Sequence, residues 1–181
     1  QELIEALVRD ARAHGCKAVV VTFDPDPDVV VSPSPAQKLM TTVDRLHALA
    51  QTGVDAVVAV PFTPEVAALD HVDFLSLVSR LVDIRSIRVG SDFRLGRGGA
   101  SGVAEMRAWG SEHGVDVYGH DLLCEGGEAI CATRIRHELG QGHVELAAEL
   151  LGRPYIVRGG VTRGRHEGSD MGFPTANLQV P

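Results

Sequence analysis

Apolar and polar positions follow one another in short blocks, and these blocks predict an α/β protein. The almost continuous apolar run at residues 17–23 predicts a strand buried on both faces of a parallel sheet. Further strands are predicted at residues 55–61, 86–90 and 115–118. Between them, apolar residues recur at helical spacing over residues 1–14, 41–53, 71–82 and 103–113. Alternation of strand and helix predicts one Rossmann-like parallel sheet with right-handed crossovers and helices on both of its faces.

A fifth strand is expected to end at Ala132 and to run directly into a helix, in the stretch ICATRIRHEL. Thr133 is the expected N-cap of that helix. The exposed amides at the helix start, with Thr133, Arg134 and Arg136 beside them, form a candidate phosphate site. An ordinary capped helix with solvated arginines is the alternative. A last helix is predicted over residues 143–151.

Beyond Arg153 the chain becomes rich in glycine and loses its helical period, which predicts β-structure with tight turns. We therefore predict two domains, at residues 1–152 and 153–181. In GFPTAN, near the end, Thr175 and Asn177 lie two positions apart and share one side of an extended strand. A hydroxyl and an amide oxygen in this arrangement suit Mg²⁺ with a bound phosphate chain, and the alternative is a plain turn before a strand.

Two loops follow predicted strands at the edge where open α/β sheets bind their ligands. The first, TFDPDP, offers Phe23 as an apolar wall and Asp24 and Asp26 as metal or hydroxyl partners; a simple turn is the alternative. The second, SDFRLGRGG, follows Gly90 and permits close approach of its backbone to a ligand, while Phe93 suits stacking on a planar ring. Its alternative is a flexible connection with Phe93 folded onto the core.

Composition narrows the class of protein. A formal net charge of −7 argues against a general nucleic-acid or membrane-surface binder, and no apolar run approaches the roughly 20 residues of a membrane span. The three cysteines are far apart and odd in number, which predicts reduced thiols and a cytoplasmic protein. Nothing in the composition indicates an oligomeric state. Because Gln1 already lies within a helical pattern, the chain is expected to be a fragment of a longer protein.

Taken together, these stretches resemble the bacterial bifunctional riboflavin kinase/FAD synthetases over essentially the whole chain. TFDPDP is similar to that family's TFDPHP loop, VGSDFRLG to its VG-x-DF-x-FG segment, and ICATRIR to its ISSTRIR phosphate motif. The stretch from LLGRPYIV to GFPTANL resembles the join between the two domains and the start of the kinase, whose P-T-A-N motif binds Mg-nucleotide.

The resemblance implies a nucleotidyltransferase-type domain that transfers AMP from ATP to FMN, followed by the start of a riboflavin kinase β-barrel. It implies FMN, ATP and riboflavin as small-molecule partners and Mg²⁺ as cofactor. Thr133 and Arg136 would then be catalytic, with Arg134 and Gly90 also at the phosphates. Phe23, Asp92 and Phe93 would bind the flavin. Thr175 and Asn177 would hold Mg-nucleotide in the kinase half.

Three departures from the family pattern alter this expectation. The 181 residues contain no H-x-G-H, the family's signature for the ATP phosphates. Asp26 replaces the histidine of TFDPHP, and Cys131 with Ala132 replaces the two serines of ISSTR. We therefore expect the 181-residue chain by itself to be nearly inactive. Two alternatives stay open, namely a homologue that binds flavin or nucleotide without catalysis, and a nucleotidyltransferase for another phosphate ester.

Overall fold

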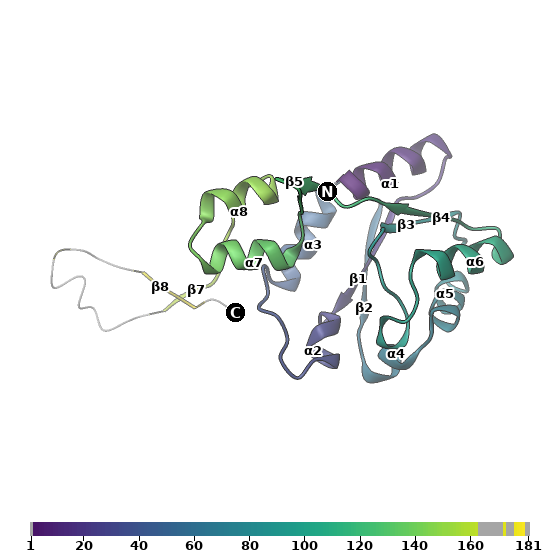
Figure 1. The fold of residues 1–181 in the computed structure, drawn as a ribbon, viewed down its shortest axis with the longest axis horizontal. Helices are drawn as coiled ribbons and strands as arrows, with labels where there is room; N and C mark the ends of the chain where they lie inside the picture. The colour runs from purple at the N-terminus through teal and green to yellow at the C-terminus, as the bar shows by residue number, and fades with distance from the viewer. Residues whose placement is uncertain (1, 163–171, 173–175, 180–181) are drawn as a thin grey trace. The chain divides into compact units, whose positions relative to one another are not determined.

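The computed structural model describes residues 2–162, 172 and 176–179. The chain forms two compact units, one of Gln1–Gln37 with Thr42–Ala129 and one of Lys38–Thr41 with Ile130–Pro181. The helices, labelled in Figure 1, are α1 (Glu2–Ala13), α2 (Pro27–Val31), α3 (Thr42–Ala50), α4 (Pro64–Ala68), α5 (His71–Ser79), α6 (Val103–His113), α7 (Ala132–Gly140) and α8 (Val144–Leu151). The strands are β1 (Val19–Asp24), β2 (Ala56–Pro61), β3 (Ser86–Gly90), β4 (Asp116–His120), β5 (Cys124–Glu125), β6 (Glu128–Ala129), β7 (Gly160–Thr162) and β8 (Asn177–Gln179).

The first unit contains two parallel strand pairs. β1 pairs with β2 from Val19↔Ala56 to Asp24↔Pro61, and β3 pairs with β4 from Ser86↔Asp116 to Gly90↔His120. The four predicted strands and their parallel direction are thus confirmed. The single predicted sheet is not, because the described strands form two-stranded sheets. A run of apolar residues indicates a strand, but it does not indicate which strand lies beside it.

The prediction that the first strand is buried on both faces is wrong for this structure. The side chains of Val19 and Val21 are 36% and 44% exposed, and Val58, the partner of Val21, is 45% exposed. α3 packs on β2 and α1 packs on β3. The face of the β1–β2 pair that carries Val19, Val21 and Val58 therefore remains open.

The main core lies around the β3–β4 pair, between α5 and α6. Its buried residues are Leu75, Leu95, Met106, Trp109, Val115 and Val117. Met106 and Trp109 lie on the inner side of α6, since they are 1% and 3% exposed. Gly110 permits the close approach of α6 to the start of β4, because a Cβ atom there would lie 2.3 Å from the Val115 carbonyl oxygen.

Two short helices, α2 and α4, follow β1 and β2 where no helix was predicted. Each begins with a proline in its first turn, which suits that position because the missing N–H needs no partner there. At the start of α4 the Thr63 side chain accepts a hydrogen bond from the Val66 N–H at 3.4 Å. Local signals for both helices are therefore present in the sequence.

The second unit contains the helix pair α7–α8, with Ile135, Ala147 and Leu150 buried. Cys131, not Thr133, is the N-cap of α7, with φ −140° and ψ 164°, and its side chain makes no capping hydrogen bond. Extended backbone at residue 131 lets the helix begin at Ala132, which places Thr133 inside the first turn. The predicted helix over 143–151 is confirmed as α8.

Strands β7 and β8 pair antiparallel, from Gly160↔Gln179 to Thr162↔Asn177. They confirm the prediction of β-structure after residue 153 for the residues described. The domain boundary at residue 153 and the β-barrel stay predictions. Within the part of the chain that the structure describes, no helix combines the length and the apolar character needed to cross a bilayer.

Candidate functional site

An aromatic pocket lies where β1 and β2 end. Phe23 and Phe62 form an edge-to-face pair with ring centroids 5.1 Å apart, and the Phe23 and Phe74 centroids are 5.9 Å apart. The pocket is lined by Phe23, Phe62, Val66, Ala67, Leu69, Phe74, Leu95 and Gly96. Its volume of about 40 Å³ is well below the roughly 300 Å³ of a typical small-molecule site. A flavin ring would therefore enter only if Phe62 and Phe74 move away from Phe23.

The TFDPDP loop is tied to the first turns of α3. Thr42 Oγ1 donates to Asp24 Oδ1 at 2.8 Å, and the Arg45 guanidinium pairs with the Asp26 carboxylate. Arg45 Nη2 also donates to the Phe23 carbonyl oxygen at 2.7 Å. Both carboxylates considered as metal ligands thus have protein partners. Among the described residues, no group of three or more His, Cys, Asp or Glu side chains is arranged to hold a metal ion.

The glycine-rich loop after β3 is held by hydrogen bonds at several points. Leu95 and Ser101 exchange two backbone hydrogen bonds, of 2.8 and 3.0 Å, and the Arg97 N–H donates to the Leu69 carbonyl at 2.7 Å. The buried Ser101 hydroxyl lies 2.7 Å from His71 Nδ1, at the start of α5. The loop therefore has a defined path that carries Gly96 into the aromatic pocket.

The predicted flavin residues of this loop lie in different surroundings. Phe93 is partly buried and packs against the main core, as in the alternative considered for it. Asp92 is exposed, and a Cβ atom at Gly90 would lie 2.8 Å from its Oδ1, so the side chain folds back over the strand end. Phe23 lines the aromatic pocket. The structure thus places only Phe23 among the pocket-lining residues, and the roles of Asp92 and Phe93 stay predictions.

Two carboxylates near these loops are stabilised in their charged form. A hydrogen bond from the Thr63 side chain lowers the pKa of Glu65, at the start of α4. The Gly102 backbone N–H, 2.7 Å from the Glu105 carboxylate, lowers the pKa of Glu105, at the start of α6. Both acids lie in the first turn of a helix, where negative charge is favoured. Both carboxylates therefore stabilise the first turn of their helix, and with a lowered pKa they offer no proton for acid–base catalysis near neutral pH.

The predicted phosphate residues lie along the first turns of α7. Thr133 is exposed, Ile135 is buried, and Arg134 and Arg136 are half-buried. Both arginines take part in interactions within the protein. In the kinase segment Asn177 is exposed on β8 opposite Thr162, while Thr175 lies outside the described residues. These arrangements leave the phosphate and Mg²⁺ roles as predictions.

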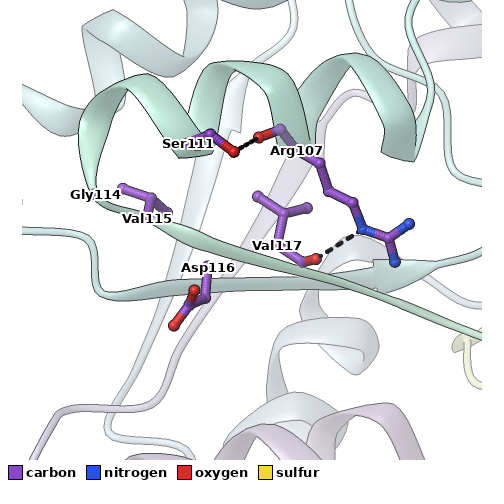
Figure 2. A pocket seen from close by; sticks show the side chains of 7 residues that line it. Arg107, Ser111, Gly114, Val115, Asp116 and Val117 are labelled. Carbon is purple, nitrogen blue, oxygen red and sulfur yellow. Dashed lines mark hydrogen bonds between the residues drawn. The ribbon is translucent and has the colours of Figure 1, made fainter.

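A larger hollow of about 440 Å³ lies at the amino end of β4, where α6 turns into the strand (Figure 2). Arg107 Nε donates to the Val117 carbonyl oxygen at 3.1 Å, and the Ser111 hydroxyl donates to the Arg107 carbonyl oxygen at 2.9 Å (Figure 2). Asp116 is exposed at its rim. None of the residues predicted to act at a site lines this hollow. We therefore place the candidate site at the aromatic pocket, despite its smaller volume.

Sequence reasoning missed Phe62, Phe74 and Arg45. Phe62 directly follows the predicted strand over residues 55–61, and Phe23 ends the predicted strand over residues 17–23. This matching position at the end of a strand could have identified Phe62. Phe74 reads as an ordinary apolar residue of a helix. Arg45 reads as a solvated charge on a helix, and no local pattern marks its contact with residues 23 and 26.

Comparison with known proteins gives two family matches. A model described as FAD synthetase matches residues 1–134, and one described as riboflavin kinase matches residues 151–181. A bifunctional riboflavin kinase/FMN adenylyltransferase of Escherichia coli K12 is 33% identical over 180 residues, covering 98% of this chain and 58% of the relative. The protein of the same name from Listeria monocytogenes is 30% identical over 182 residues, covering 99% of this chain and 58% of the relative.

Among solved structures, a Streptococcus pneumoniae protein titled macrolide-efflux protein is similar, with a TM-score of 0.87 and 25% identity. The alignment covers 99% of this chain and 59% of that one. The chain spans about 58% of the length of the Escherichia coli and Listeria monocytogenes relatives.

Proposed function

Because the chain belongs to the FAD synthetase family, we propose that the protein transfers AMP from ATP to FMN, giving FAD and pyrophosphate. The first unit would be a nucleotidyltransferase-type domain. The observation that carries the proposal is the aromatic pocket at the end of β1 and β2, formed by Phe23, Phe62 and Phe74 beside the TFDPDP loop. Flat aromatic walls suit the isoalloxazine ring of FMN.

The reaction needs no covalent enzyme intermediate. An oxygen of the FMN phosphate attacks the α-phosphorus of ATP, a new P–O bond forms, and the bond to pyrophosphate breaks in line. The protein's contribution is to align two anions and to stabilise the charge that develops between them. Mg²⁺, when bound, would neutralise phosphate charge; Thr175 and Asn177 are the residues proposed for it in the kinase half.

We assign the flavin to Phe23, with Asp92 and Phe93 on the neighbouring loop. The phosphates of ATP are assigned to Thr133, Arg134 and Arg136 of α7, with Gly90 at the end of β3. The amides in the first turn of α7 and the guanidinium of Arg136 suit an anion. Riboflavin phosphorylation is proposed as a second activity, on the match of residues 151–181 to riboflavin kinase.

A binding protein without catalysis is the second candidate. It is favoured by the N-cap of α7, where Cys131 makes no capping hydrogen bond and Ala132 follows. Neither residue offers a hydroxyl to a phosphate. FMN binding is expected in both cases, whereas FAD formation separates them.

Quenching of flavin fluorescence on titration with the 181-residue chain tests the flavin site. We expect saturable binding of FMN, and Phe23→Leu should weaken it by about three- to tenfold because ring stacking is lost. Absence of binding by the wild-type chain would exclude the proposed function. Val117→Ala, a core change at the start of β4, is the control and should leave the FMN Kd unchanged.

Replacement of Arg136 by methionine tests the phosphate assignment. Loss of a hydrogen bond to a charged group should weaken ATP binding by roughly tenfold or more, measured by calorimetry, with the FMN Kd unchanged. Arg153→Met is the matched control in the same unit, because the Arg153 guanidinium is exposed and donates to the adjacent Pro154 carbonyl at 3.2 Å. Equal ATP affinity in the two variants would remove Arg136 from the site.

A further inference from the structure

Arg45 connects α3 to both sides of the TFDPDP loop. Its Nη2 donates to the Phe23 carbonyl oxygen at 2.7 Å, and its Nη1 pairs with the Asp26 carboxylate. The side chains of Arg45 and Asp26 are only 24% and 28% exposed. Arg45 Nε is buried and has no hydrogen-bond partner, so the guanidinium is directed wholly at these two residues.

This arrangement fixes the backbone at the point where the Phe23 ring leaves β1. A guanidinium is a rigid plane, so two of its nitrogens bound to different groups fix the direction of both. One of these groups is the carbonyl of Phe23 itself, whose ring lies against Phe62 and Phe74. The orientation of the peptide after Phe23 is therefore coupled to α3.

The Asp26 carboxylate pairs with Arg45 in place of capping the helix that follows it. Asp26 is the N-cap residue of α2, yet its side chain makes no capping hydrogen bond there. Capping with an aspartate typically stabilises a helix by about 1 kcal/mol. The carboxylate instead pairs with Arg45, while Thr42, in the same helix, holds Asp24 at 2.8 Å. The first turns of α3 thus form hydrogen bonds or an ion pair with Phe23, Asp24 and Asp26 of the loop.

We propose that Arg45 is a positioning residue for flavin binding, which acts by holding Phe23 in the orientation that FMN requires. The inference rests on the proposed function, because it presumes that FMN occupies the aromatic pocket. Arg45 touches no ring of the pocket and supplies no catalytic group.

The test compares Arg45→Met and Arg45→Lys with a matched control, Arg12→Met. Arg12 forms the same pair of bonds elsewhere, with Nη1 on Asp55 Oδ2 at 2.7 Å and Nη2 on the Gly53 carbonyl at 3.2 Å. FMN and ATP affinities of the 181-residue chain are measured for each variant, well below its Tm. We expect Arg45→Met to raise the FMN Kd by about tenfold through lost preorganisation, with the ATP Kd unchanged.

Arg45→Lys should rescue FMN binding only in part, because one ammonium cannot reproduce the planar fork. Arg12→Met should leave the FMN Kd as in the wild type. A double variant gives the sharper result. If Arg45 acts through Phe23, then Phe23→Leu with Arg45→Met should bind FMN no more weakly than the worse single variant.

Three results would overturn the inference while the proposed function stands. The first is that Arg45→Met binds FMN with the wild-type Kd. The second is that Arg12→Met raises the FMN Kd as much as Arg45→Met does. The third is that the increases in FMN Kd of the two single variants multiply in the double variant. Failure of the wild-type chain to bind FMN would instead remove the proposed function, and this inference with it.

Discussion

Arg12 and Arg45 form nearly identical bridges at opposite ends of the β1–β2 pair. Each places Nη1 on a carboxylate and Nη2 on a backbone carbonyl oxygen. At the amino end, Arg12 is 50% exposed, and Asp55 also accepts from the Ala18 N–H at 2.8 Å and pairs with Lys17 at 3.5 Å. At the carboxyl end, Arg45 is half as exposed and reaches the residue whose ring lines the aromatic pocket.

The difference between the ends lies in what each bridge holds. The Arg12 bridge fixes the start of two strands, where the Asp55 N–H also donates to the Ala18 carbonyl at 2.8 Å. None of its residues lines the aromatic pocket or the hollow beside β4. The Arg45 bridge fixes a loop next to an aromatic wall. The same hydrogen-bond pattern thus fixes the pairing of two strands at the Arg12 end and the geometry of the candidate site at the Arg45 end.

The largest effect on stability is expected at Gly96, in the loop after β3. Gly96 lines the aromatic pocket with φ 80° and ψ 173°, a region open essentially to glycine alone, and a Cβ atom would lie 2.9 Å from the His71 backbone nitrogen. Gly96→Ala should therefore lower the free energy of unfolding by about 3 kcal/mol or more. The measurement is urea denaturation.

Gly114→Ala is the control for this variant. Gly114 has φ 68° in the left-handed region, but a Cβ atom there meets nothing within 4 Å. Only the backbone cost of about 1 kcal/mol is expected. Equal losses in the two variants would show that the pocket side of the fold is no tighter than the α6–β4 turn.

An intermediate effect on stability is expected when acid protonates Asp55, at the amino end of the β1–β2 pair. The hydrogen bond from Arg12, with that from the Ala18 N–H, lowers the pKa of Asp55 from 3.8 to about 2. Because the folded pKa is the lower one, the carboxylate stabilises the fold above pH 3.8. That contribution is lost as the pH falls from 3.8 to about 2. Urea midpoints across this window should fall less steeply for Asp55→Asn, and an unchanged slope would contradict the assignment.

The smallest effect is expected from added salt, through its influence on the stability that each arginine bridge contributes. The Arg12 bridge is exposed, so added NaCl should screen it and reduce the stability difference between wild type and Arg12→Met. The Arg45 bridge is largely shielded from solvent, so the difference for Arg45→Met should change little. Thermal unfolding at low and high salt measures both. Equal salt dependence would mean that burial does not distinguish the two bridges.

Local patterns predicted most elements because each depends on neighbours in the chain. The strand over Ser86–Gly90 and the helix over Val103–His113 have the predicted bounds. The capping residue of α7 was misplaced by two positions because Thr133 and Cys131 are both compatible with a helix start, and backbone conformation decides between them. For the site, sequence identified the TFDPDP loop and Phe23. It did not identify Phe62, Phe74 or Arg45 as their partners.

The sequence alone determined the α/β class, the parallel strands, the two loops at their ends and the resemblance to riboflavin kinase/FAD synthetases. These follow from periodicity and from short motifs, which are local properties. Only the tertiary structure decided that the strands form two pairs, that Asp26 faces an arginine rather than a metal, and that three phenylalanine rings meet. Each of these depends on residues 19 to 51 positions apart, whose contact arises from packing and leaves no pattern along the chain.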